Sequence, residues 1–523
     1  MAHTWRSKTL RFIWLLPVAG LLPLAAWGAT FNPTRFDDPV PNGCQPGDCS
    51  LREAVLAANN TPEADTIVLS DGTYQVLLNG SESNLTGDLD VRSGLSIRGP
   101  ATIDGQNQGR IFDIDDESHV LFEDLTLQNA NTSLATNGTL NGGAVQVSSG
   151  SLTLRFVVLR DNATQSQGAG VYTTDEAVLR VEDSVFYNNV ASNGAGIFAT
   201  DDLTVRNTVF LDNQADLRGA AVYVQGTQSD ATFREVSLIG NESMGSGGGA
   251  VLFLGRDLRI DNLLATGNQC LDGFGGVLTT TGTAHGKSLL ISNALFFDNE
   301  AENGGALSLA DDEDPVAIIH SAFVDNSALD NAGAIYSTGG LIDIANVTFS
   351  GNSAVGDGGT LWLFGRTIAF RQVTITGGSA DRGNALFVGG STVVSEATLV
   401  NTIVDGDCAF LNADTVSSGG GNVESPGNSC GFNDSSDQAG VSAQDLGLGS
   451  LKQYDGVAPF HPLSPTSVAR GAGEPLVCAA LPLDQVFGPR ASNCSAGSID
   501  GAVLFSDGFQ ALPSLGSKLD FSP

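Results

Sequence analysis

The chain has 523 residues and a formal net charge of −34 at pH 7, although only 16% of its residues are charged. Binding to phosphate groups requires clustered lysine and arginine, so this charge excludes nucleic acid and anionic lipid as expected partners. The 65 glycines and only 2 methionines are typical of short strands joined by tight corners. We therefore expect one elongated all-β domain built by repetition.

Residues 1–28 are predicted to be a signal peptide. Three basic residues between positions 6 and 11 precede an apolar run over 12–26, and cleavage is expected after Gly28. No later segment has the roughly 18 consecutive apolar residues that a membrane-spanning helix needs. The mature chain is thus expected to be exported without a transmembrane segment, and its cysteines to lie in an oxidising compartment.

Residues 29–64 are expected to form an N-terminal cap. Cys44 and Cys49 bracket a Gln-Pro-Gly-Asp turn, and residues 50–59 have the pattern of a short helix with Ser50 as its N-cap and Glu53 three positions later. A cap is needed because an open β-helix exposes a sheet edge at each end.

Residues 65–400 carry a recurring phrase, namely a bulky apolar residue, two variable residues, Asn, and then a glycine-rich step into another apolar run. Successive asparagines of the phrase are 24 to 31 residues apart, which lies within the range of solenoid repeats. Their side chains are expected to hydrogen-bond the backbone of their own corner and of adjacent rungs. These structural asparagines are Asn162, Asn189, Asn213, Asn241, Asn268, Asn299, Asn326 and Asn352.

The glycine steps and the short alternating runs between the asparagines predict the fold. Glycine suits corners with positive φ, and a hydrophobic period of two, as in Leu341–Ile344, indicates strands. Stacking of such rungs pairs each strand in parallel with its counterparts. The expected fold class is an all-β, right-handed parallel β-helix, a solenoid of roughly thirteen rungs with disulfide-linked capping segments.

Prolines mark where the ladder ends, because a residue without N–H cannot pair on both sides. Only Pro315 occurs between Pro100 and Pro426, and it follows the acidic stretch 311–314, which we expect to be an extruded loop containing this proline. Nine prolines follow residue 425. The ladder is therefore expected to end within 401–421, with a C-terminal cap over 401–500 and a tail over 501–523.

Three groups of residues resemble known bacterial exported proteins. The run Cys49–Ala54 matches the signature of the CSLREA-domain family over all six residues, and the Phe-x-x-Asn and Gly-Gly-Ala-Ile/Leu phrases are similar to those of chlamydial polymorphic outer-membrane proteins. The C-terminal side resembles the choice-of-anchor Q domain, with these matching pieces: Asn401–Val404, Asp407–Cys408, Gly421–Asn422, Cys430, His461–Leu463, Cys478, Asp484–Gln485, Gly488–Arg490 and Cys494.

The resemblance implies a pectin-lyase-like right-handed β-helix that a bacterium secretes or displays at its cell surface in association with the outer membrane. Adhesion or surface display is the function that the resemblance suggests. It implies no defined substrate.

The spacing of the cysteines suits a capping role. We expect three disulfides between near neighbours, each closing a short loop in a flank with little core: Cys44–Cys49, Cys408–Cys430 and Cys478–Cys494. Closing a loop of about 15 to 20 residues contributes roughly 3 kcal/mol in the chain-entropy model. Cys270 has no partner in this pairing and is expected to be a buried small apolar side chain.

No catalytic set stands out in the sequence. The acidic pairs Asp115–Asp116, Asp201–Asp202 and Asp311–Asp312 all lie at expected corners, where a solvated acid is the ordinary case. His119 and His320 are expected to pack or to face solvent, and no histidine pair has zinc-ligand spacing. We expect no cofactor and no metal site, with Ca²⁺ at the 311–314 loop as the open alternative.

Arginines are the remaining candidates for chemistry. Elimination on an acidic polysaccharide would need an arginine or lysine beside carboxylates, and Arg98, Arg110 and Arg155 are candidates. The sequence does not show which acids lie near them.

Two functions are compatible with the sequence. The first is an exported, non-enzymatic, structural and adhesin-like shaft that binds a surface or glycan ligand. The alternative is a polysaccharide lyase or glycoside hydrolase of the pectin-lyase-like class. That alternative would be favoured by two acids, or acids with an arginine, along one exposed groove.

Overall fold

The structure is a computed structural model that describes residues 28–77, 87–134, 140–281, 288–310, 315–364, 367–389, 396–411, 415–454 and 456–500. The expected signal peptide up to residue 27, the acidic stretch 311–314 and the tail 501–523 lie outside the described residues. Within the described ranges, no helix is both long enough and apolar enough to cross a membrane.

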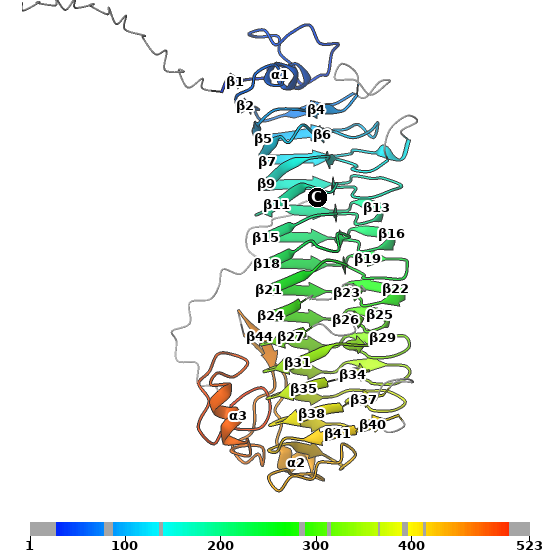
Figure 1. Ribbon diagram of the computed structural model, residues 1–523, viewed down its shortest axis with the longest axis vertical. Coiled ribbons are helices and arrows are strands. Elements are labelled where there is room, and N and C mark those ends of the chain that lie inside the picture. The colour runs from blue at the N-terminus through cyan, green and yellow to red at the C-terminus, as the bar shows by residue number, and fades with distance from the viewer. Residues whose placement is uncertain are drawn as a thin grey trace, which may run out of the picture.

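The chain winds into a right-handed parallel β-solenoid, which confirms the predicted fold class (Figure 1). Three sheets run along its length, and all pairings between the solenoid strands are parallel. The solenoid has about 11 turns and its second sheet has 13 strands, so the predicted figure of roughly thirteen rungs is approximate. Each turn adds about 4.8 Å to the axis.

Sheet 1 has 22 strands. Some turns contribute one long strand to it, and the others contribute two shorter strands. Its strands are β1 (Thr30–Phe31), β2 (Asp65–Val68), β3 (Thr73–Gln75), β5 (Leu95–Asp104), β7 (His119–Gln128), β9 (Gly150–Arg160), β11 (Ala177–Glu182), β12 (Val185–Tyr187), β15 (Leu203–Leu211), β18 (Ala231–Ile239), β21 (Asp257–Thr266), β24 (Ser288–Phe297), β27 (Pro315–Ile319), β28 (Ala322–Val324), β31 (Leu341–Ala345), β32 (Thr348–Ser350), β35 (Thr367–Arg371), β36 (Thr374–Thr376), β38 (Glu396–Val400), β39 (Ile403–Asp405), β41 (Thr415–Ser418) and β42 (Val423–Ser425).

Sheets 2 and 3 have one strand per turn. The 13 strands of sheet 2 are β4 (Leu89–Val91), β6 (Phe112–Ile114), β8 (Val145–Val147), β10 (Val171–Thr173), β14 (Ile197–Ala199), β17 (Val222–Val224), β20 (Val251–Phe253), β23 (Leu278–Thr281), β26 (Leu307–Ala310), β30 (Ile335–Ser337), β34 (Leu361–Leu363), β37 (Leu386–Val388) and β40 (Cys408–Phe410). The 7 strands of sheet 3 are β13 (Val190–Asn193), β16 (Gln214–Arg218), β19 (Glu242–Ser243), β22 (Gln269–Phe274), β25 (Glu300–Asn303), β29 (Ser327–Ala328) and β33 (Ser353–Ala354).

In the rungs between Asp124 and Gly383, left-handed residues turn the chain at three corners. In one rung these are Asn207 (φ 44°), Asp212 (φ 51°) and Gly219 (φ 58°). The third corner needs glycine, because a Cβ at Gly219 would lie 2.6 Å from the carbonyl oxygen of Val222. Ala332 (φ 64°) occupies the equivalent corner of a later rung and is the exception among these positions.

The eight asparagines of the repeat form one hydrogen-bonded stack inside the solenoid, and every one is fully buried. Asn241 shows the pattern, since its Nδ2 donates to the Phe210 carbonyl at 3.0 Å and to Asn268 Oδ1 at 2.9 Å. Its own Oδ1 accepts from the backbone N–H and the Nδ2 of Asn213. An amide within the stack thus joins three successive rungs and satisfies backbone groups that the corner leaves unpaired.

Apolar side chains stack in the same way on the inner side of sheet 1. The rings of Phe296, Phe323 and Phe349 lie with centroids 4.5 and 4.9 Å apart, and all three side chains are fully buried. Burial of each phenylalanine contributes about 1.5–3 kcal/mol. No rung has a closed core of its own, so each rung is stabilised by the rungs above and below it.

Helix α1 (Leu51–Ala58) covers the N-terminal end of the solenoid (Figure 1). Ser50 and Glu53 form the expected capping box, and Leu51 and Ala54 pack into the main core. Arg52 is buried, pairs with Asp38 at 2.8 Å and donates to backbone carbonyl oxygens of residues 87 and 88. The residues of the Cys49–Ala54 run therefore serve the cap itself.

The C-terminal region does more than cover an end. The ladder continues to β42, slightly beyond the predicted limit of residue 421, and the short helix α2 (Ala443–Leu446) follows it. We call residues 443–500 the C-terminal segment. This segment, with the hairpin β43 (Lys452–Tyr454) and β44 (Val457–Phe460) and helix α3 (Pro475–Ala480), doubles back along the outside of sheet 1 (Figure 1).

Contacts of two kinds hold the C-terminal segment on sheet 1. Ala458 of β44 packs against Ala322 and Val324 of β28. Thr348 of β32 donates to Gln485 Oε1 at 2.6 Å. These contacts join residues more than 100 positions apart, so the segment clasps several rungs from outside.

The three expected disulfides, Cys44–Cys49, Cys408–Cys430 and Cys478–Cys494, are all present, which confirms the predicted pairing. Cys270 is free and fully buried, and burial raises the pKa of its thiol to about 12. This thiol is therefore unreactive at neutral pH. The placement of Pro315 in a loop is wrong, because it begins β27 opposite Leu341, a first position where a strand tolerates proline.

Candidate functional site

The outer face of sheet 2 carries one side chain from the middle of each strand. In β20, for example, Val251 and Phe253 belong to the main core, whereas Leu252 belongs to a separate cluster outside it. The strand register aligns these middle residues in a row along the solenoid axis. In order they are Asp90, Asp113, Gln146, Tyr172, Phe198, Tyr223, Leu252, Thr279, Ser308, Tyr336, Trp362, Phe387 and Ala409.

Aromatic rings occupy two parts of this row. Phe198 lies between Tyr172 and Tyr223, with ring centroids 5.5 and 4.8 Å away, and Leu252 continues the cluster. Further along, Tyr336 stacks on Trp362 at 4.6 Å with an interplanar angle of 11°. The row is thus largely apolar, with Tyr172, Tyr336 and Trp362 half-buried and its other aromatic rings buried.

The second aromatic part extends past Trp362. Phe387 stacks on Trp362 at 6.1 Å and 8°, and the guanidinium of Arg382 lies 5.0 Å from the Phe387 ring centroid. Both faces of Trp362 are therefore covered, while one face of Tyr336 is turned toward Ser308 and Thr279, which interrupt the aromatic row.

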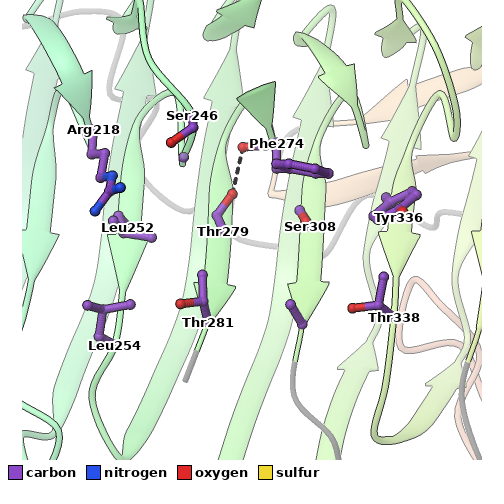
Figure 2. Close-up of a pocket in the computed structure, with 12 residues that line it drawn as sticks. Arg218, Ser246, Leu252, Leu254, Phe274, Thr279, Thr281, Ser308, Tyr336 and Thr338 are labelled. Carbon is purple, nitrogen blue, oxygen red and sulfur yellow. Dashed lines mark hydrogen bonds between the residues drawn. The ribbon is translucent and has the colours of Figure 1, made fainter. Parts of the chain in front are cut away.

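A groove of about 360 Å³ lies where the aromatic row is interrupted (Figure 2). Phe274 of sheet 3 forms one wall, with its ring centroid 5.7 Å from that of Tyr336. Thr279 Oγ1 donates to the Phe274 carbonyl at 2.6 Å and accepts from the Gly248 N–H at 3.1 Å, which fixes this corner of the groove. The lining residues are Arg218, Ser246, Gly247, Leu252, Leu254, Phe274, Thr279, Thr281, Ser308, Ala310, Tyr336 and Thr338.

The groove combines hydroxyl groups with aromatic and aliphatic surface. Among the residues that the structure describes, its lining includes no carboxylate, and Arg218 is the single charged side chain. Arg218 is exposed and forms no ion pair with any residue within the described ranges. Burial, with a smaller contribution from Asp330, raises the pKa of Tyr336 above its usual value, so its hydroxyl remains a neutral donor and acceptor.

A second group of polar side chains lies at the N-terminal end of the same row. Asp88, Asp90 and Asp113 each offer a carboxylate oxygen, and these oxygens all lie within 4.8 Å of one another. The buried Arg110 Nε donates to Asp88 at 2.7 Å, and its NH2 lies 3.4 Å from Asp113. Arg92 pairs with Asp90 at 3.2 Å.

Burial sets the protonation of this acidic group. Burial raises the pKa of Asp90 to about 6, and the negative charge of Asp88 acts in the same direction. Burial also raises the pKa of Asp113 to about 6, although the positive charge of Arg110 opposes this shift. Carboxyl groups of this kind can exchange a proton near neutral pH. The three oxygens could also hold a divalent cation, although the Arg110 guanidinium already supplies positive charge there.

The acids named from the sequence have structural partners instead. Asp201 Oδ2 accepts from the Glu176 N–H at 3.1 Å, and Asp202 Oδ1 accepts from the Asp230 N–H at 2.8 Å, so both stabilise corners. Asp115 and Asp116 are exposed at the corner after β6. Asp311–Asp312 and the open Ca²⁺ alternative fall on 311–314, outside the described residues.

The named arginines and histidines also have defined surroundings. Arg98 and Arg155 both pair with Glu123 on sheet 1. His119 is exposed beside Ser151, and His320 stacks on Phe487 of the C-terminal segment. Of the three arginines singled out, only Arg110 lies at the outer face of sheet 2.

The sequence reasoning missed both the groove and the acidic group. One signal was present, because an aromatic residue follows the first aliphatic residue of several glycine steps, as in Val171–Tyr172 and Leu361–Trp362. That position is the outward one in every strand of sheet 2. The gap at Thr279 and Ser308 becomes visible only once the register is known.

Comparisons with known proteins agree with the architecture. Residues 102–269 match the family model of the right-handed beta helix region. The chain is also similar to the mannuronan C-5 epimerase AlgE6 A-module of Azotobacter vinelandii, with 14% identity and a TM-score of 0.37, over 76% of this chain and 99% of that chain. A TM-score of this size carries no argument about function. No curated protein matches the chain in sequence.

The fold and these findings define the class as a right-handed β-helix protein with the architecture of the pectin-lyase-like group. Within that class the molecule is a three-sheet solenoid with three disulfides, a capped N-terminal end and a C-terminal segment that lies along sheet 1.

Proposed function

We propose that this protein is an exported β-helix of the bacterial cell surface or extracellular space, and that it binds a glycan on the outer face of sheet 2. The observation that carries the proposal is the groove between Leu252 and Tyr336, where aromatic surface and hydroxyl groups meet on an outer surface. Sugars present both kinds of surface, since their C–H faces pack on rings and their hydroxyls hydrogen-bond.

The charge and the fold support a binding role. Acidic character keeps an exported protein soluble and monomeric, and it disfavours nucleic acid. The solenoid gives the groove a rigid base, because each side chain of the row stands on a strand paired on both sides. The C-terminal segment contacts sheet 1, and none of its described residues lines the groove on sheet 2.

The direct test is binding to an array of bacterial, plant and host glycans, followed by calorimetry on the glycans retained. The mature protein and the groove variant Ser308→Trp are compared. Retention by the wild-type protein and loss in the variant support the proposal. Absence of any glycan binding, or binding that the variant leaves intact, contradicts it.

The enzyme remains the second candidate, and one observation favours it. Asp90 and Asp113, both with pKa values of about 6, lie beside Arg110 on the face that carries the groove. Carboxyl groups with pKa values near neutrality are suited to act as general acid or base in polysaccharide cleavage. The test is to incubate glycans of the binding panel with wild-type protein and Asp113→Asn, and to measure reducing ends and unsaturated products. Turnover that the substitution abolishes would establish the enzyme.

Export is a proposal of its own, based on residues 1–28. We expect a tagged full-length chain to appear in the extracellular or outer-membrane fraction, and a chain without these residues to stay inside the cell. Equal distribution of the two chains would contradict export by this segment.

A further inference from the structure

We infer that the groove on sheet 2 binds a neutral oligosaccharide, one ring of which packs against Tyr336 and Phe274 where the aromatic row is interrupted. This inference rests on the proposed glycan binding and specifies the class of glycan. It follows from the geometry of the interruption, from the chemistry of its lining and from the sign of the nearby charge.

The interruption has the dimensions of a sugar ring. Leu252 and Tyr336 are three rungs apart in the row, with Thr279 and Ser308 between them, which corresponds to about 14 Å along the axis at about 4.8 Å per rung. The Phe274 ring reaches into this stretch, and the remaining groove of about 360 Å³ has room for one or two six-membered rings. Figure 2 shows this stretch between Leu252 and Tyr336, with the small side chains of Thr279 and Ser308 at its base.

Tyr336 provides one flat surface to this space. The opposite face of the Tyr336 ring is covered by Trp362, whose ring centroid is 4.6 Å away and whose plane is nearly parallel. This stacking holds the plane of the Tyr336 ring across the solenoid axis. Phe274 lies beside it at 5.7 Å with its plane tilted by 46°. A ring that enters from the Ser308 side therefore meets the Tyr336 face and the Phe274 ring together and continues the stack by one member.

Polar groups surround the same space. The hydroxyls of Ser246, Ser308 and Thr338 line the groove, and Tyr336 adds its own neutral hydroxyl. Each hydroxyl can both donate and accept, which matches the alternating hydroxyls of a sugar. An entirely apolar ligand would leave these groups without partners and would bind less well.

The charges select a neutral ligand. The described part of the lining holds no carboxylate to pair with an amino sugar, and the net charge of −34 repels a polyanionic chain. Arg218 at the rim is exposed, so its charge is already solvated and needs no anion. Its N–H groups are suited to donate to sugar hydroxyls.

The test measures the binding of five soluble hexasaccharides to the whole mature protein by calorimetry. Three are neutral, namely the gluco-, manno- and xylo-oligomers, and two are charged, namely oligogalacturonate and fully deacetylated chito-oligomer. We expect at least one neutral series to bind more tightly than both charged ones. Removal of the aromatic anchor in Tyr336→Ala, and occlusion in Ser308→Trp, should each weaken that binding about tenfold or more. Tyr336→Phe, which keeps the ring, should stay within about threefold of the wild-type protein.

Tyr172→Ala is the matched control, because Tyr172 is a half-buried tyrosine of the same row outside the groove. It should leave the affinity within about twofold. Thermal unfolding of every variant is measured in parallel. If Tyr336→Ala does not fold, the affinities of Ser308→Trp and Tyr336→Phe are compared instead to decide the assignment. Failure of all five oligosaccharides and of the wider array rejects glycan binding itself. Tighter binding of a charged oligomer, or equal losses in Tyr172→Ala and Tyr336→Ala, rejects only the assignment made here.

Discussion

His461 Nε2 lies 2.9 Å from Ser350 Oγ, although 111 positions separate the two residues in the chain. The other ring nitrogen, Nδ1, lies 2.7 Å from the Gly449 carbonyl oxygen. A neutral imidazole with its hydrogen on Nδ1 satisfies both contacts, because it donates to the carbonyl and accepts from the serine hydroxyl. This histidine therefore fastens the C-terminal segment to β32 in its uncharged form.

The C-terminal segment is expected to loosen in acid. Burial lowers the pKa of His461, with Asp405 opposing, and lowers that of His320, which faces Phe487 with Asp484 and Arg490 nearby. The unfolded chain then binds more protons than the folded one as the pH falls through about 6.5, so stability declines below that pH.

Hydrogen exchange of residues 443–500 measures this effect, and protection should fall between about pH 7 and pH 5. His119→Gln is the control, because His119 is exposed and distant from the segment in the chain. Protection that stays constant over this range would show that the two histidines do not fasten the segment.

Asp113 should have the opposite effect. Its pKa is raised to about 6, mainly by burial, so its contribution to stability is present below the ordinary pKa of about 4 and is lost as the pH rises through about 6. Asp113→Asn should stabilise the protein at pH 7 by on the order of 1–2 kcal/mol, and by little at pH 4. Urea unfolding at both pH values tests this expectation, and equal effects at the two pH values would contradict it.

The asparagine stack should be sensitive to the loss of a single amide. Asn241→Ala removes the acceptor of the Asn213 backbone N–H and side chain and leaves the Phe210 carbonyl without its donor. Orphaned buried groups cost about 1–3 kcal/mol each, so we expect a destabilisation of about 3 kcal/mol in chemical unfolding. Gln214→Ala, which truncates an exposed amide on sheet 3, is the control and should change stability by under about 0.5 kcal/mol.

One corner is open to improvement. Ala332 has a φ of 64° at the corner where other rungs have glycine, a conformation that costs an L-residue roughly 1–2 kcal/mol. Ala332→Gly should therefore raise the melting temperature, with a net gain of about 1 kcal/mol after the greater freedom of the unfolded chain is counted. Ala334→Gly, two positions later and fully buried, should instead lower it. A lower melting temperature for Ala332→Gly would show that the corner is not strained.

The repeat could be predicted because each of its signals is local. A corner with positive φ restricts the residue type at that one position, and a buried amide that bridges rungs restricts the residue type at its own position. Gly219 and Asn213 are therefore visible in the sequence alone. The disulfides were predictable for the same reason, since each pair joins near neighbours.

The groove and the acidic group depend instead on register. Asp90 and Asp113 are direct partners across two strands, while Asp115, only two residues later, lies at a corner. A short strand that shifts by one residue exchanges its inner and outer side chains, so the outward position of Tyr336 requires knowledge of the strand phase. The return of the C-terminal segment along sheet 1 has no local signal, because its partners, such as Thr348 and Gln485, are 137 positions apart.

The corners also bear on how the length of this molecule can change. Three residues separate β14 from β15 and six separate β17 from β18, yet the strands on either side keep the same pairing. Extra residues at a corner bulge outward and leave the neighbouring turns in place. Duplication or deletion of one whole turn outside the rungs that the C-terminal segment contacts would likewise preserve the pairing of neighbouring turns, so the reach of the rod can evolve in single steps without redesign of its ends.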